Sequence, residues 1–374
     1  SSDLFERRFE KQEAALKYIY KRLMDLFLRL YILFGSKPLK MEYNELKGHQ
    51  LNSILVFSNT ALGDTLLSTP AIKSLKDSFP NARITLFIHK NIYPLLEGVE
   101  YIDNFVIYHG GYKKFFATVM QLRHLKADAA LLLHSNGPQD IPMAIMSGAK
   151  ILLKTPTKSS YKHYLSYEFA KKEQHTIEDR LDLVKGLGGD KTTIRMTLPK
   201  RYYEDKGRNI LPPDAVVIGF QPGAANIYKM WPVESFKELA SRLLTEYPNV
   251  IIAVTGSKKE SKLGEAIKEV NPQRIQNFCG KFPIENLPNL INEMDVLVTN
   301  DTGTMHIAIA LGIHTVELFS GSESKDTGAY QDLDRHTIIQ KDGSYIRDGG
   351  AKKHRSDDAM KLIGADEVFK WIKI

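Results

Sequence analysis

The chain has 374 residues, which suggests two domains or slightly more at about 150 residues per domain. Its hydrophobic fraction of 43% and charged fraction of 25% exclude a largely disordered or collagen-like chain. No run approaches about 18 uncharged apolar residues, which excludes a multi-span membrane protein. The formal net charge of +7 keeps nucleic acid, a membrane surface and a phosphorylated substrate as possible partners, although no nucleic-acid-binding motif is present.

Cysteine usage bears on the cellular compartment. The single cysteine, Cys279, cannot form an intrachain disulfide, which favours a reducing environment. The first residues lack a charged segment followed by an apolar stretch and a small-residue cleavage site. We therefore expect a cytoplasmic protein.

Residues 1–50 are predicted to form an N-terminal amphipathic helical extension. Apolar residues recur there at helical spacing, with basic residues between or before them. One interpretation is a helix that lies on a membrane surface, and the other is a helix packed against its own domain or a partner subunit. The pattern leaves both open. The apolar positions are Leu16, Ile19, Tyr20, Leu23, Phe27, Leu30 and Phe34.

From residue 51 onward, short apolar runs alternate with amphipathic stretches. Strands are expected at residues 53–57, 83–88, 105–108 and 129–133, and helices at 71–75 and 114–125. After a linker at 195–214, strands are expected at 215–220, 250–254, 295–299 and 315–319, and helices at 235–244 and 304–311. Such alternation is typical of parallel strands joined by crossover helices.

The predicted fold class is therefore α/β, with two doubly wound Rossmann-like domains facing a cleft. The first would span residues 51–200 with a linker to about 214, and the second residues 214–350. A C-terminal helical segment would follow at 351–374. Ligands in such folds bind beyond the carboxyl ends of the strands, so the strand-to-helix loops are the candidate sites.

The loop at residues 58–65 contains Gly63, which permits close backbone approach, and Asp64 at the start of the next helix. Asp64 is either a helix N-cap or a general base at the mouth of a cleft. The following pair, Thr69 and Pro70, marks either a later helix start or a kink.

Three loops in the second half carry features that suit phosphate or ribose groups. Residues 221–232 combine small residues with Lys229, which suits a diphosphate. Residues 255–260 could place Glu260 near a ribose hydroxyl pair, a weak signal when taken alone. Residues 300–306 begin a helix with phosphate-binding character, although a histidine on such an apolar helix, here His306, is more often a buried core residue.

Familiar cofactor motifs are missing from these loops. There is no P-loop and no Gly-x-Gly-x-x-Gly fingerprint, and neither a His-Glu-x-x-His nor an Asp-x-Asp element occurs. This disfavours dehydrogenase chemistry and a protein-held catalytic metal.

Taken together, the loops resemble glycosyltransferase family 9, the ADP-heptose:lipopolysaccharide heptosyltransferases of Gram-negative bacteria. The resemblance runs from about residue 53 to 319, in the same order and with similar spacing. Three blocks carry it: Leu62, Gly63, Asp64, Thr69, Pro70 and Ala71; Pro222, Gly223, Ala224, Lys229, Met230, Trp231 and Pro232; and residues 299–312. A further turn, Asp326, Thr327 and Gly328, also fits.

The resemblance implies a GT-B fold with an N-terminal acceptor domain and a C-terminal nucleotide-sugar domain. It implies inverting, metal-independent transfer of heptose from ADP-heptose to a lipopolysaccharide inner-core acceptor at the cytoplasmic face of the inner membrane, without a cofactor. Asp64 would be the base, with Gly63 and Thr65 on the acceptor side. The implied donor-binding residues are Gly223, Lys229 (diphosphate), Glu260 (ribose), Phe282 (adenine pocket), Asp301 (heptose hydroxyls), Thr302 and Gly303 (phosphate oxygens) and His306 (support of the phosphate loop).

This chain departs from the family pattern at several positions. Ser58 stands where an arginine is frequent, and Gln221 where a histidine is frequent; Ala224 and Ala225 replace threonines, and residues 319–322 replace a Phe-Gly-Pro-Thr turn. Two alternatives therefore stay open. One is the same fold with another nucleotide sugar or surface-glycan acceptor. The other is a non-catalytic sugar-nucleotide-binding scaffold at the membrane, against which the presence of both Asp64 and Lys229 argues.

Overall fold

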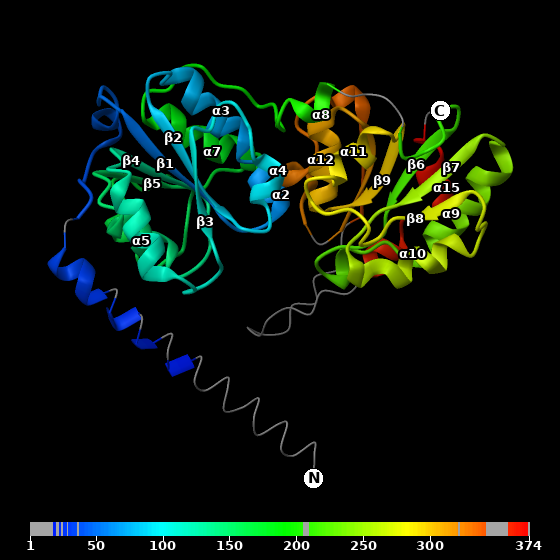
Figure 1. Ribbon diagram of the computed structural model, residues 1–374, viewed down its shortest axis with the longest axis horizontal. Coiled ribbons are helices and arrows are strands. Elements are labelled where there is room, and N and C mark those ends of the chain that lie inside the picture. Colours follow the sequence, from blue (N-terminus) through cyan, green and yellow to red (C-terminus); the bar gives the residue numbers. More distant parts are fainter. Residues whose placement is uncertain are drawn as a thin grey trace, which may run out of the picture.

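The computed structural model describes residues 18–341 and 358–372, apart from residues 20, 21, 24, 28, 36, 205–208 and 321. Two parallel sheets with flanking helices form two domains that lie side by side (Figure 1). The first sheet has the strand order β3-β2-β1-β4-β5 and the second β11-β10-β9-β6-β7-β8. The predicted α/β class with two Rossmann-like domains is confirmed.

The first domain is built on five strands that are apolar on both faces, as buried parallel sheets require. Side chains of β1 alternate between two cores: Ile54 and Val56 pack with α3 and α7, and Leu55 and Phe57 pack with α5 and α6. The strands are β1 (Ser53–Ser58), β2 (Arg83–His89), β3 (Asn104–Tyr108), β4 (Ala129–His134) and β5 (Ile151–Lys154). The helices are α2 (Leu62–Leu66), α3 (Thr69–Ser78), α4 (Tyr93–Leu96), α5 (Phe115–His124), α6 (Asp140–Met146) and α7 (Thr176–Gly186), with 3-10 turns η1 (Tyr43–Leu46) and η2 (Lys162–Tyr164).

The second domain repeats this plan with six strands. They are β6 (Val216–Gln221), β7 (Val250–Val254), β8 (Ile275–Asn277), β9 (Val296–Asn300), β10 (His314–Phe319) and β11 (His336–Gln340). Its helices are α8 (Arg201–Glu204), α9 (Val233–Glu246), α10 (Ser261–Lys268), α11 (Leu287–Asn292), α12 (Gly303–Leu311), α13 (Ser324–Thr327), α14 (Asp358–Lys361) and α15 (Ala365–Phe369), with 3-10 turns η3 (Ile227–Lys229), η4 (Lys258–Glu260) and η5 (Leu333–Arg335). Every strand and helix expected between residues 51 and 319 forms. Gly312 closes α12 in the left-handed conformation (φ 76°), which favours glycine.

Two connecting segments are more ordered than their composition suggested. The expected linker at 195–214 contains α8, and Arg195 pairs with Asp332 through contacts of 2.6 and 2.5 Å. The described part of the C-terminal segment packs into the core of the second domain, where Met360, Ile363 and Val368 are buried. It is therefore part of that domain rather than an appendage.

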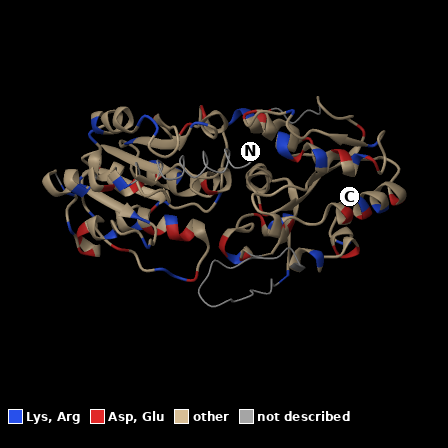
Figure 2. Ribbon diagram, turned by 90° about the horizontal axis from the view of Figure 1, so that it is seen from below, with Lys and Arg blue, Asp and Glu red and all other residues tan. Residues whose placement is uncertain are grey.

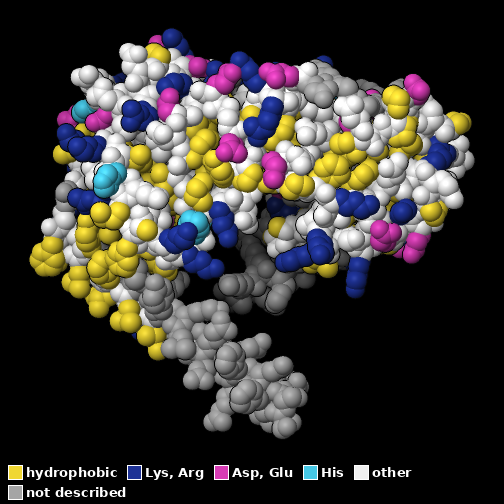
Figure 3. Space-filling view, in the orientation of Figure 1, with side chains coloured by type: hydrophobic (Ala, Val, Ile, Leu, Met, Phe, Trp, Pro, Cys, Tyr) yellow, Lys and Arg dark blue, Asp and Glu magenta, His cyan; other side chains and the backbone are white. Residues whose placement is uncertain are grey.

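The N-terminal extension is helical at every described position from 18 to 34. One side docks on the first domain: Ile32 is fully buried, Tyr161 donates a hydrogen bond to Asp25, and Arg123 donates one of 2.8 Å to Tyr31. The other side stays exposed, and apolar side chains gather there and over the neighbouring α5 (Figure 3). The helix thus packs on its own domain and still leaves an apolar face uncovered.

Charged side chains of both signs are spread over both domains (Figure 2). None of the helices in the described parts of the chain is long and apolar enough to cross a membrane.

Candidate active site

The two domains meet where α2 of the first approaches α12 of the second. A Cβ atom added at Gly63 would lie 2.5 Å from Cδ2 of His306, and one added at Gly303 would lie 2.6 Å from Cδ2 of Leu62. Contacts this short are not tolerated by side chains. The two glycines therefore allow the helix starts to touch, which confirms the expected close approach at Gly63.

A cavity of about 450 Å³ lies at this junction. One of its walls is apolar and is formed by Phe282, Ile284 and Leu287, and the opposite wall consists of small and polar residues. This combination is typical of sites that bind small molecules. Of the residues singled out from the sequence, the cavity brings together Gly63, Gly223, Glu260, Phe282, Thr302 and Gly303.

The start of α12 presents unsatisfied hydrogen-bonding groups to this cavity. Thr302 is the N-cap residue, but its side chain makes no capping hydrogen bond. Its buried Oγ1 has no hydrogen-bond partner among the described residues. The first N–H groups of a helix lack partners within the helix and carry partial positive charge. This end of the cavity can therefore bind an anion such as a phosphate.

The side chain of Glu260 packs against Gly223. A Cβ atom on Gly223 would come 1.8 Å from Oε1 of Glu260, so the carboxylate occupies the space that any other side chain would fill. The same carboxylate accepts a hydrogen bond from the Ser257 backbone N–H in a capping box. Glu260 is thereby held at the cavity wall, where its other oxygen can accept a hydrogen bond from a ligand hydroxyl.

Lys229 forms an ion pair with Asp301 beside the cavity. Ser322 also donates a hydrogen bond of 2.7 Å to the Asp301 carboxylate. Burial would raise the pKa of Asp301, but the charge and hydrogen bonds of these partners together lower it. The loop that carries Lys229 is anchored by Trp231, which is 1% exposed and donates its backbone N–H to Asn300 at 3.0 Å. The loop that carries Lys229 is therefore an ordered turn.

Asp64 does not cap α2, because the N-cap residue is Ala61. Its carboxylate Oδ1 lies 3.2 Å from Nε2 of His134 and 3.5 Å from Nη2 of Arg180. Arg180 also donates a hydrogen bond of 2.6 Å to the Asp64 backbone carbonyl. The Asp64 side chain is 28% exposed whereas that of Arg180 is completely buried. The carboxylate is thus fixed on one side and open to solvent on the other.

The surroundings of Asp64 control its protonation. Burial raises the pKa of Asp64, the nearby charge of Asp301 adds to this, and Arg180 opposes both. The pKa of His134 is lowered to about 3 by burial, so this imidazole is neutral near pH 7. A neutral imidazole next to an ionised carboxylate donates from Nε2, and its Nδ1 then accepts the hydrogen bond from Thr60. Asp64 is held as an oriented proton acceptor.

Five of the residues expected at the site do not line the cavity: Asp64, Lys229 and Asp301, described above, and also Thr65 and His306. Thr65 is fully buried and donates its hydroxyl to the Ala61 carbonyl at 3.0 Å, a bond within its own helix. His306 is buried against Gly63, and burial lowers its pKa to about 4. Its Nδ1 has no hydrogen-bond partner among the described residues. His306 therefore supports the junction as a neutral packed ring.

His134 and Arg180 were not anticipated. His134 is the last residue of β4, so its position at a carboxyl-terminal strand end was a usable signal. Arg180 lies on α7, a helix that the sequence analysis did not predict, and it reaches Asp64 across 116 residues of chain. Ser58 stands where the resemblance leads one to expect arginine. It is buried, and its hydroxyl forms a hydrogen bond of 2.8 Å with the hydroxyl of Ser68. The cation beside Asp64 comes from α7 instead.

No group of three or more His, Cys, Asp or Glu side chains in the described ranges is placed to hold a metal ion.

Two Rossmann-like domains with a cavity at their junction are the arrangement of the GT-B fold of glycosyltransferases. The family model of glycosyltransferase family 9 (heptosyltransferase) matches residues 144–347, and the chain belongs to this family. It is 24% identical over 329 residues to lipooligosaccharide heptosyltransferase 2 of Haemophilus influenzae, covering 77% of this chain and 88% of that protein.

Solved structures agree at the level of the fold. Escherichia coli ADP-heptose lps heptosyltransferase II has a TM-score of 0.68 at 20% identity, over 85% of this chain and 96% of that one. A family 9 glycosyltransferase from Veillonella parvula has a TM-score of 0.68 at 22% identity, over 86% and 95% of the two chains. The predicted family and enzyme class are confirmed.

Proposed function

We propose that this enzyme transfers heptose from ADP-heptose to a lipopolysaccharide inner-core acceptor, with inversion and without a metal. Family membership and the relatives named as heptosyltransferases support heptose as the sugar. The observation that carries the reaction is the junction itself, where the start of α12 lines a cavity and the charges of Lys229 and Asp301 act on the carboxylate of Asp64.

The donor would occupy the cavity at the junction, mainly against residues of the second domain. Its adenine would lie against the apolar wall at Phe282, and its ribose hydroxyls would meet Glu260. The diphosphate would accept hydrogen bonds from the start of α12 and from Lys229. Displacement of Asp301 by the diphosphate would free the carboxylate for the heptose hydroxyls, since both groups compete for the same ammonium.

Asp64 would act as the general base. The acceptor hydroxyl oxygen attacks the anomeric carbon, its proton passes to Asp64, and the bond from the anomeric carbon to the diphosphate oxygen breaks. Negative charge then grows on the leaving diphosphate, where Lys229 and the N–H groups of α12 stabilise it. The raised pKa of Asp64 suits this task, because a base is most effective when its pKa approaches the working pH.

The variant Asp64→Asn tests this proposal, since it removes basicity and nearly preserves shape. Turnover should fall by roughly 10²- to 10⁴-fold while ADP affinity measured by calorimetry stays unchanged. Asp190→Asn, at an exposed position, is the matched control and should retain full turnover. Wild-type turnover in Asp64→Asn would contradict the assignment. A panel of ADP- and UDP-sugars tests the donor, and a preference for any other sugar nucleotide would replace ADP-heptose in the proposal.

The exposed face of the N-terminal helix would hold the enzyme on anionic membrane, near a lipid-linked acceptor. Its apolar side chains are flanked by the exposed basic residues Arg22, Lys113 and Lys114, and each such charge contributes about 1 kcal/mol near an anionic surface. The exposed apolar residues are Ile19, Leu23, Leu26, Leu30, Leu33 and Phe34 of the helix, with Phe116 and Met120 of α5.

A double variant, Leu30→Ser with Leu33→Ser, tests the membrane contact. Sedimentation with anionic vesicles should drop, more so at high salt, while transfer to a soluble acceptor continues. Leu362→Ser is the control, because Leu362 is 67% exposed on the other domain. Unchanged vesicle binding by the double variant would remove this part of the proposal.

A further inference from the structure

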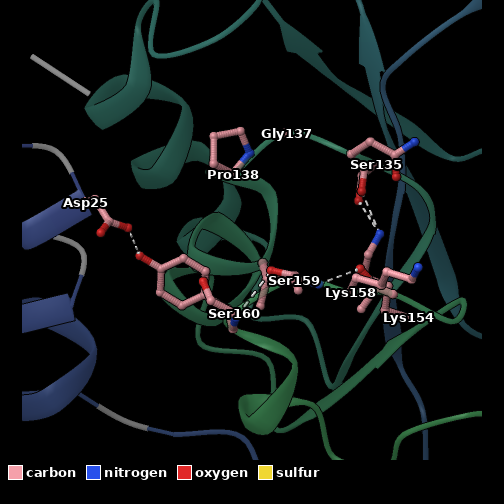
Figure 4. Close-up of a pocket in the computed structure, with 12 residues that line it drawn as sticks. Asp25, Ser135, Gly137, Pro138, Lys154, Lys158, Ser159 and Ser160 are labelled. Atoms are coloured by element: carbon pink, nitrogen blue, oxygen red, sulfur yellow. Dashed lines mark hydrogen bonds between the residues drawn. The ribbon is translucent and has the colours of Figure 1, made fainter. Parts of the chain in front are cut away.

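A second cavity, of about 410 Å³, lies in the first domain and is not part of the donor site. Its walls come from the loop after β4, the end of β5 with the loop that follows, and Asp25 of the N-terminal helix (Figure 4). Most of the residues that line it are polar, and Ser135, Thr157, Ser159 and Ser160 carry hydroxyl groups.

Lys154 gives this cavity its charge. It is the last residue of the buried strand β5 and is only 4% exposed, yet its side chain points toward Ser135 at the cavity wall (Figure 4). Its ammonium donates to the Ser135 carbonyl at 2.5 Å and lies 3.4 Å from the Ser135 hydroxyl. No carboxylate in the described ranges lies within ion-pair distance of it. Burying an ammonium without a paired anion is costly, so this position favours an anionic ligand.

The nearest acidic neighbours do not neutralise Lys154. Asp140 attracts it from a distance, but the Asp140 carboxylate already accepts hydrogen bonds from Gly137 N–H at 2.7 Å and Asn59 at 3.2 Å. Asp25 accepts hydrogen bonds from Tyr161 and Arg29. Burial lowers the pKa of Lys154 to about 8, and the ammonium form therefore still predominates at neutral pH. A second lysine, Lys158, lines the same cavity from an exposed position.

The cavity lies next to the candidate base. Ser135 directly follows His134, whose Nε2 is 3.2 Å from Asp64, and Asn136 of the cavity wall lies 3.2 Å from the same nitrogen. Both Asp64 and Lys154 stand at the carboxyl-terminal edge of the first sheet. A molecule that presents a hydroxyl to Asp64 could therefore extend past His134 into this cavity.

We propose that this cavity binds an anionic group of the sugar acceptor, a carboxylate or a phosphate, through Lys154, Lys158 and the surrounding hydroxyl groups. The proposal rests on the proposed function, because it takes Asp64 to mark the acceptor hydroxyl. A lysine ammonium group is a compact charge with three hydrogen-bond donors. It can bind a carboxylate or a phosphate without the bidentate geometry that arginine requires. The site would select acceptors that carry a negative charge beside the reacting sugar.

The test compares two soluble acceptors that differ only in an anionic group on the sugar next to the accepting hydroxyl. Lys154→Met and Lys158→Met should each raise the KM for the anionic acceptor by about 10- to 100-fold, the range for hydrogen bonds to charged groups. The KM for the neutral acceptor, the KM for the donor and both kcat values should stay near wild type. Lys150→Met, at an exposed lysine before β5, is the matched control.

Each outcome decides a separate point. An equal rise of KM for both acceptors, or no rise for either, would overturn the anion site. If Lys154→Met does not fold, Lys158→Met at its exposed position carries the same test. Wild-type enzyme that transfers to neither acceptor would instead count against the proposed function.

Lysine variants that also lose binding to phosphatidylglycerol vesicles without acceptor would assign the site to a lipid headgroup and overturn the acceptor proposal. Inorganic phosphate should compete with the anionic acceptor in the wild type, and phosphate that competes equally with the neutral acceptor would mark the cavity as a free-phosphate site.

Discussion

Replacing Arg180 by methionine should move the acid limb of the pH–rate profile to higher pH. Arg180 is fully buried and its Nη2 lies 3.5 Å from Oδ1 of Asp64, so it is the main charge that holds this carboxylate ionised against burial. Two unit charges at that separation interact by about 5 kcal/mol at an effective dielectric constant of about 20. Since one pH unit corresponds to about 1.4 kcal/mol, even a third of this interaction moves the limb by about one unit.

The assay is kcat/KM for the acceptor as a function of pH at saturating donor. Asp64 must be ionised to accept the proton, so the rate on the acid side should fall about tenfold for each unit of displacement and recover at higher pH. Arg180→Lys retains a charge and should restore part of the profile. An acid limb that stays in place in Arg180→Met would refute the view that this guanidinium sets the protonation of Asp64.

Stability has the opposite pH dependence and separates catalysis from unfolding. The pKa of Asp64 is raised in the folded state, so its protonated form favours folding and its contribution is lost as pH rises through the folded pKa. Arg180→Met should strengthen this trend, with thermal stability decreasing toward the pH at which the rate recovers. A variant that loses rate and stability together as pH falls would indicate unfolding rather than an altered base.

Three further changes probe the donor side and the junction. Lys229→Ala should weaken ADP binding by about 1.5–3 kcal/mol in calorimetry and leave adenosine binding unchanged, and equal losses would place Lys229 in the fold rather than at the diphosphate. Gly63→Ala forces a methyl group against His306 and should lower stability by about 1–3 kcal/mol as well as turnover, whereas Gly364→Ala, which meets open space, should change neither. Chelation of divalent ions with EDTA should leave turnover intact, and loss of activity restored by an added divalent ion would contradict the metal-free mechanism.

Much of the fold followed from periodicity, because buried parallel strands are short, continuous apolar runs. The strands that escaped prediction are those whose runs are short or polar: β5 ends in Lys154, β8 is only three residues long, and β11 begins with His336 and ends with Gln340. Helix α7 also escaped, since Arg180 and Asp179 interrupt its apolar pattern. Their burial depends on partners supplied by distant segments, which local pattern does not reveal.

The residues that we propose for the donor side could be located from the sequence for a related reason. Gly223, Lys229, Thr302 and Gly303 lie between the carboxyl ends of β6 and β9 and the first turns of the helices that follow, and a parallel sheet brings all such segments to one edge. Thr65 was misjudged as a residue facing the site because its neighbours Gly63 and Asp64 do face it, whereas the turn of α2 directs its hydroxyl back to the helix.

The acceptor half is built differently, and this bears on specificity. Asp64 is oriented by His134 from β4 and by Arg180 from α7, and the nearby anion cavity draws Lys154 from β5 and Asp25 from the N-terminal helix. These side chains come from segments that are far apart in sequence, so no short motif describes them. A donor that is shared across a family can bind to residues of short, contiguous loops. An acceptor that differs between members binds to residues that the packing of each chain brings together. The charges around Asp64, rather than the family motifs, are therefore where the acceptor preference of this enzyme should be sought.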